Sequence, residues 1–112
     1  MEPIAEANTK RLVFISYSST RYDLADLTRS YLERNKINVW LDTASIEVGA
    51  DWRNEIDSGI LASDLVIVLL DKESSVSSYV TYEWAFALGN RKPVIPIMVE
   101  DCKIHERLSV LQ

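Results

Sequence analysis

The chain has 112 residues, which suits one domain with a core of four or five strands and their covering helices. Its formal charge of -5 excludes a general nucleic-acid binder, because such a protein needs a basic face for the phosphates. The single cysteine and single histidine, Cys102 and His105, exclude an internal disulfide and leave too few ligands for a zinc site, so we predict no metal. No apolar run approaches the roughly 18 residues of a membrane span, and we predict no membrane partner.

Residues 1–10 are polar and show no periodic pattern, which predicts a flexible leader before a domain over residues 11–112. This leader lacks the basic start and the long apolar stretch of a secretory signal. We therefore predict a cytoplasmic protein.

Short apolar runs alternate with amphipathic segments from residue 11 onward. The runs predict strands over residues 11–16, 37–42, 65–70 and 94–99. The helical periodicity of the segments between them predicts helices over residues 22–35, 52–62 and 78–89. The run 65–70 contains no polar residue, which is typical of a central strand, whereas Pro96 places the last strand at a sheet edge or at a bulge.

Polar residues and one glycine predict where the helices begin and end. Thr20 and Asp23 have the spacing of a capping box for the first helix. Asp51 can cap the second helix and Ser78 the third. Gly89 stands where a residue in the left-handed conformation is favoured at a helix end.

Strands that alternate with helices imply right-handed crossovers and a mainly parallel sheet. We therefore predict an α/β, doubly wound, flavodoxin-like fold with strand order 2-1-3-4 and helices on both faces. Strands 1 and 3 are then neighbours at the point where the connections turn to opposite faces, and ligands bind there. The loops that bound this crevice are residues 16–20 and 71–78.

Glu83 is the most unusual residue near this crevice. It is surrounded in the sequence by the aromatic residues Tyr79, Tyr82 and Trp84, and such a setting costs stability unless the charge is used. The alternative is a surface glutamate paired with Arg or Lys. Trp84 itself is predicted to lie in the core.

Two other functions that occur on this topology fit the sequence less well. A phosphorylated receiver domain would use Asp71, but it also needs an acidic pair after the first strand, where this chain has Ser16, Tyr17 and Ser18. We therefore interpret Asp71 as a solvated loop residue. Flavin or dinucleotide binding in the Rossmann manner needs glycines after the first strand, and none is present there. Cys102 has no activating neighbour and is interpreted as a plain thiol.

Six segments, in this order, resemble a TIR domain of the bacterial type. They are Phe-Ile-Ser-Tyr-Ser at 14–18, Val-Trp-Leu-Asp at 39–42, Gly-Ala-Asp-Trp-Arg at 49–53, the apolar strand 65–70, Tyr-Glu at 82–83 and Lys-Pro-Val-Ile-Pro at 92–96. The resemblance runs from about Arg11 to at least Val99. TIR domains usually continue into a fifth strand and a last helix, so the resemblance implies that this chain is shortened at its C-terminus.

The resemblance implies one of two functions. The first is cleavage of NAD+ to nicotinamide and ADP-ribose or a cyclic ADP-ribose, activated by self-association, in defence or virulence signalling. The second is a non-catalytic adaptor that binds other TIR domains. In both, residues 42–51, from Asp42 to Asp51, match the BB loop, which gates the pocket and contacts neighbouring domains. Another N-glycosidic enzyme on a similar sheet, such as a nucleoside deoxyribosyltransferase, is a minor third possibility.

In the enzymatic reading, Glu83 is catalytic and NAD+ is a substrate rather than a cofactor. Nicotinamide leaves NAD+ as a neutral ring that needs no proton, so one carboxylate suffices where an ordinary glycosidase needs two. Tyr79, Tyr82, Trp40 and Trp52 are candidates for stacking on the ligand, although both tryptophans also suit the core. Further candidate contacts are Ser16, Ser18, Arg21, Asp42 and Arg53. An exposed apolar fourth strand also predicts an oligomer or weak solubility.

Overall fold

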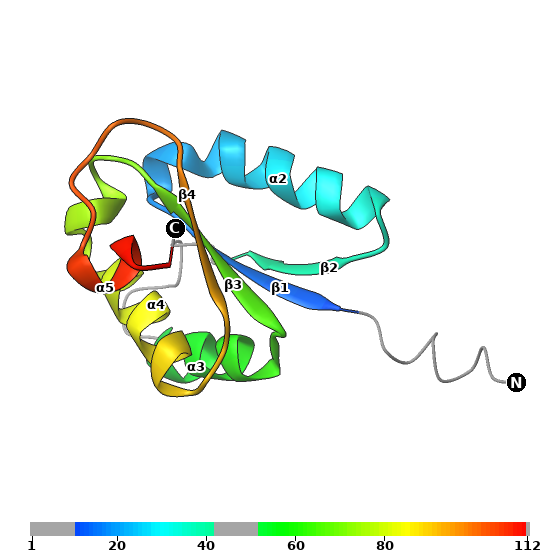
Figure 1. Cartoon of the computed structure of the whole chain (residues 1–112). Coiled ribbons are helices and arrows are strands. Elements are labelled where there is room, and N and C mark those ends of the chain that lie inside the picture. Colours follow the sequence, from blue (N-terminus) through cyan, green and yellow to red (C-terminus); the bar gives the residue numbers. More distant parts are fainter. Residues whose placement is uncertain (1–10, 42–51, 112) are drawn as a thin grey trace, which may run out of the picture.

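The computed structural model describes residues 11–41 and 52–111, apart from the side chain of Trp52, and contains one parallel four-stranded sheet (Figure 1). Its strands are β1 (Leu12–Ser16), β2 (Asn38–Leu41), β3 (Leu65–Leu70) and β4 (Val94–Met98). They are arranged in the order β2-β1-β3-β4, and every neighbouring pair is parallel. This confirms the predicted flavodoxin-like fold.

The helices lie on both faces of the sheet (Figure 1). Helix α2 (Tyr22–Arg34) covers one face, and α3 (Trp52–Ala62) and α4 (Ser78–Gly89) cover the other. Three shorter helical segments are η1 (Ser19–Arg21), η2 (Ser74–Val76) and α5 (Glu106–Ser109). The predicted helices and strands exist, with described ends that agree or differ by one residue, as is usual for fraying termini.

The sheet separates two apolar cores because successive side chains of a strand point to opposite faces. Val13, Ile15 and Tyr17 pack against Ala25 of α2 in the first core. The second core lies under α3 and α4 and is formed mainly by Phe14, Ile56, Ile60, Val66, Val68, Leu70, Val80 and Trp84. The prediction for Trp84 is thereby confirmed. The alternation of β1 also directs Ser16, two residues after Phe14, toward the face of α4.

The helix ends differ from the predictions. The capping box is wrong: the side chain of Arg21, the N-cap of α2, makes no capping hydrogen bond, and the Thr20 hydroxyl lies 3.1 Å from that of Ser18. Ser77, one residue before the predicted cap, accepts a hydrogen bond from the amide of Val80 at α4. Gly89 has no left-handed φ, and the left-handed residue after α4 is Arg91, with φ of 60°. Asp51 lies outside the described residues.

The two outer strands of the sheet are β2 and β4. Pro96 of β4 pairs in register with Val68 of β3, so it lies at an edge and not at a bulge. Ile95, Ile97 and Met98 of this strand are exposed. The predicted association through this edge stays a prediction. In the described part of the chain, no helix has both the length and the apolarity that crossing a membrane requires.

Candidate functional site

The carboxyl ends of β1 and β3 meet at one edge of the sheet. From there the chain continues to α2 on one face after β1, and to α4 on the other face after β3. Ser16, the last residue of β1, pairs in register with Val68 of β3. The residues that follow both strands therefore lie next to each other, as expected at a topological switch point. Two buried acidic side chains, Glu83 and Asp71, are found here.

Glu83 is 0% exposed, and its Oε1 accepts a hydrogen bond from the hydroxyl of Ser16. The alternative of a surface glutamate is therefore wrong. Val80, Glu83, Trp84 and Ala87 are the buried residues of α4, and their spacing of three and four residues forms one helical stripe against the sheet. A buried carboxylate loses its hydration and is costly unless hydrogen bonds replace the lost water. The hydroxyl of Ser16 supplies one such bond.

Asp71 is 1% exposed and makes three hydrogen bonds through its carboxylate. It accepts from Nε of Arg21 at 2.8 Å, from the hydroxyl of Ser18 at 3.1 Å and from the amide of Ser74 at 2.7 Å. The prediction of a solvated loop residue is therefore wrong. Burial acts to raise the pKa of Asp71, but these hydrogen bonds outweigh it and hold the pKa below its ordinary value.

Arg21 is engaged by two carboxylates. Besides Asp71, its guanidinium contacts Oε1 of Glu100 at 3.3 Å, and the same oxygen accepts from the amide of Lys72 at 2.9 Å. This network links the segments that follow β1, β3 and β4. A phosphate that reached Arg21 would compete with both carboxylates.

The sequence contains one local signal for the turn at Asp71. The Asp71 amide donates to the hydroxyl of Ser74 at 2.8 Å, while its carboxylate accepts from the amide of Ser74. This reciprocal pair has the spacing and hydrogen-bond pattern of a capping box, in the turn that leads into η2. An aspartate followed three residues later by a serine therefore predicts a fixed turn better than a solvated loop.

Tyr79 and Tyr82 have different surroundings although both precede Glu83 on α4. Tyr79 is 54% exposed. Tyr82 is half-buried, and its hydroxyl donates to Oδ1 of Asp57 on α3 at 2.6 Å. The guanidinium of Arg53 lies 5.4 Å from the centre of the Tyr82 ring. The hydrogen bond to Asp57, together with burial, raises the pKa of Tyr82. Tyr82 and Arg53 thus contribute to the contact between α3 and α4.

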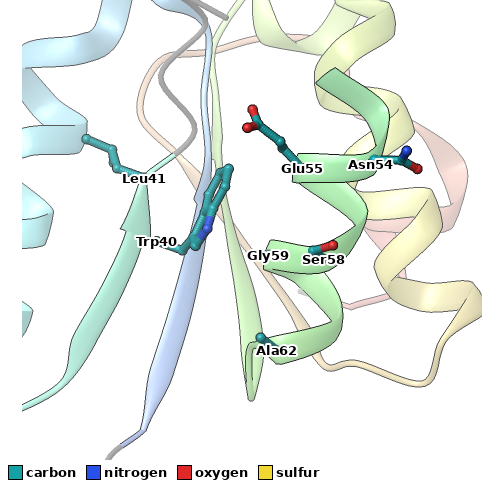
Figure 2. A pocket seen from close by; sticks show the side chains of 7 residues that line it. All are labelled: Trp40, Leu41, Asn54, Glu55, Ser58, Gly59 and Ala62. Atoms are coloured by element: carbon teal, nitrogen blue, oxygen red, sulfur yellow. The ribbon is translucent and has the colours of Figure 1, made fainter. Parts of the chain in front are cut away.

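Trp40 lines a separate hollow between β2 and α3 (Figure 2). Its indole stacks on Phe14, with ring centres 4.8 Å apart and planes 8° from parallel. The hollow has a volume of about 510 Å³ and is lined by Trp40, Leu41, Asn54, Glu55, Ser58, Gly59 and Ala62. Glu83 does not line it. Trp40 therefore has a packing role on Phe14 as well as an exposed part.

The structure brings Ser16, Ser18 and Arg21 to the edge where Glu83 lies. Asp42 and the side chain of Trp52 lie outside the described residues, so their roles stay predictions. Burial, with nearby carboxylates, raises the pKa of the Cys102 thiol, which agrees with a plain thiol.

Comparisons with known proteins agree on one family and one fold. The family model described as TIR domain matches residues 13–112. The TIR domain of the Toll-related receptor TRR-2 from Hydra magnipapillata has 20% identity and a TM-score of 0.77, over 89% of this chain and 79% of that one. The TIR domains of the activated Roq1 resistosome, which directly recognises the pathogen effector XopQ, have 20% identity and a TM-score of 0.66, over 80% of this chain and 57% of that one. At this identity the two structures show the fold. No curated protein matches the sequence.

Proposed function

Because this chain belongs to the TIR domain family, we propose that it is an NAD+ glycohydrolase or cyclase that releases nicotinamide and leaves ADP-ribose or a cyclic ADP-ribose. The family includes NAD+-cleaving enzymes. The observation that carries the proposal is the buried Glu83 carboxylate, hydrogen-bonded to Ser16 at the switch point of the sheet. Self-association activates the enzyme, and its role lies in defence or virulence signalling.

The chemistry requires few protein groups. The bond between the nicotinamide nitrogen and the anomeric carbon of the ribose breaks, and its electron pair neutralises the pyridinium nitrogen. Positive charge develops on the sugar, and the carboxylate of Glu83 stabilises it electrostatically in a site with little water. In hydrolysis, water then adds to the anomeric carbon and releases a proton. In cyclisation, a nitrogen of the adenine adds instead.

Other residues of this edge have supporting roles in the proposal. Tyr79 offers an exposed aromatic face one turn before Glu83, suited to stacking on a ring of the substrate. Arg21 and Ser18 hold Asp71. Only the hydrogen-bonding groups of these two side chains that this contact does not use can bind the substrate. Asp42, Trp40, Trp52 and Tyr82 are weaker candidates for substrate contacts.

The decisive experiment is incubation of concentrated protein with NAD+, followed by chromatography for nicotinamide and for linear and cyclic ADP-ribose. Glu83→Gln removes the negative charge, and we expect the rate to fall by at least about 100-fold. Glu33→Gln, an exposed glutamate of α2 on the opposite face of the sheet, is the matched control and leaves the rate unchanged. Equal turnover by wild type and the Glu83 variant would refute the role of this residue.

One observation favours the second function, a non-catalytic adaptor. Glu83 is 0% exposed, so a ligand reaches it only if the residues around it move. An adaptor self-associates without turning over NAD+, so light scattering combined with the NAD+ assay at the same protein concentrations distinguishes the two functions. Oligomers without released nicotinamide would support the adaptor. The proposed contact through residues 42–51 lies outside the described residues.

A further inference from the structure

We propose that Ser16 is a positioning residue for Glu83 and not a contact for the substrate. The inference rests on the proposed function, because it concerns how the catalytic carboxylate is held. Its basis is the hydrogen bond between two side chains that are both 0% exposed and stand 67 positions apart in the sequence.

Ser16 has little freedom to do anything else. Its backbone is fixed in β1, an inner strand paired on both sides, and its Cα is in register with Val68. A serine hydroxyl has one proton, and that proton is donated to Oε1 of Glu83. A ribose hydroxyl would have to displace the carboxylate to receive it. In this proposal, a positioning role therefore replaces the substrate contact that was expected of Ser16.

The bond matters because the last torsion of a glutamate side chain has only a broad, weak preference of its own. A donor in a fixed strand selects one orientation of the carboxylate plane before the substrate arrives. An electrostatic catalyst works best when its charge needs no reorientation during the reaction. Ser16 thus acts on the rate through Glu83.

Ser18 does not duplicate this role. It follows Ser16 by two residues and donates to Asp71 at 3.1 Å. The two serines therefore serve different buried acids: Ser16 holds Glu83, and Ser18 holds Asp71. Loss of the Ser16 hydroxyl leaves Glu83 without this donor while the contacts of Asp71 stay in place.

The test is steady-state kinetics on NAD+ with Ser16→Ala. We expect kcat to fall on the order of 10- to 100-fold, with KM changed less than about threefold. Ser16→Thr keeps a hydroxyl and restores a large part of kcat. Ser63→Ala is the matched control: Ser63 is 1% exposed, its hydroxyl donates to the carbonyl of Gly59 at 2.6 Å, and its loss leaves kcat unchanged. A rise in KM alone, or an unchanged kcat, in Ser16→Ala would overturn the inference while the proposed function stands.

A second measurement does not depend on activity. Urea unfolding of Ser16→Ala, Glu83→Leu and the double variant forms a double-mutant cycle, in which leucine is used because glutamine would still accept a hydrogen bond from the Ser16 hydroxyl. We expect Ser16→Ala to shift the urea midpoint in the wild-type background and much less in the Glu83→Leu background. Additive shifts would overturn the inference. If wild type does not turn over NAD+, the proposed function fails and the cycle alone decides whether Ser16 fixes Glu83. Should Ser16→Ala not fold, Ser16→Cys, with nearly the same volume and a weak donor, takes its place.

Discussion

The close approach of Gly59 to Trp40 allows a sharp prediction about stability. Gly59 lies on the side of α3 that faces β2 (Figure 2). A Cβ atom on this residue would lie 2.7 Å from Cε2 and 2.9 Å from Cδ2 of Trp40. Both are ring-fusion atoms of a rigid indole, which is stacked on Phe14 at 4.8 Å. The indole cannot retreat without losing this stacking, so Gly59→Ala forces the helix and the strand apart.

Two opposing terms set the magnitude. Alanine in place of glycine within a helix gains about 1 kcal/mol from helix propensity. Overpacking in a closely packed site costs about 1 to 3 kcal/mol. We therefore expect Gly59→Ala to lower the free energy of unfolding by about 1 kcal/mol. Gly89→Ala is the matched control: no atom lies within 4 Å of its Cβ, and at the helix end we expect a gain of about 0.5 kcal/mol.

Urea unfolding followed by far-UV circular dichroism measures both variants. The two free energies should differ by about 1 to 2 kcal/mol, with Gly59→Ala the less stable. A Trp40→Leu background removes the clash, and there Gly59→Ala should be neutral or stabilising. If Gly59→Ala is as stable as Gly89→Ala in the wild-type background, the contact with Trp40 does not constrain this position and the reasoning fails.

The remaining predictions concern two hydrogen-bonded acids, Asp71 and Asp57. Asp71→Asn should lower the free energy of unfolding at neutral pH by about 2 kcal/mol in urea experiments, because the amide cannot satisfy the same three donors. The folded pKa of Asp71 lies below its ordinary value of 3.8, so its contribution is present above that pH and is lost as the pH falls. As the pH falls below 3.8, the stability of wild type should therefore fall more steeply than that of Asp71→Asn, and parallel curves would contradict the network. Tyr82 should ionise above its ordinary pKa of 10.0 in an ultraviolet titration, and Asp57→Asn should lower that pKa; no change would argue against the hydrogen bond.

The hydrophobic pattern was sufficient to predict the fold. Four apolar runs separated by amphipathic segments admit few topologies, and the parallel order placed Ser16, Ser18 and Glu83 near one edge. The helix ends were less predictable because local capping rules compete with tertiary contacts. Thr20 has a suitable spacing, but its hydroxyl meets Ser18 instead.

The burial of the two acids could not be read from their neighbours in the sequence. Asp71 is held by Arg21, which precedes it by 50 residues, and Glu83 by Ser16, which precedes it by 67. No local composition encodes these pairs. They arise because β1 and β3 lie side by side, so the partners of a buried charge follow from the topology once strand order and register are known.

The two cores also bear on how this molecule tolerates change over evolution or in the laboratory. The sheet keeps the residues around Ala25 of α2 apart from those around Trp84 of α4. Substitutions at distant sites without shared partners have additive effects on stability. A costly change near Glu83 can therefore be compensated by better packing of half-buried residues of α2 such as Leu24 and Leu32, which leaves the acids untouched. Stability gained in the core under α2 can thus offset the cost of substitutions that change ligand binding on the other face of the sheet.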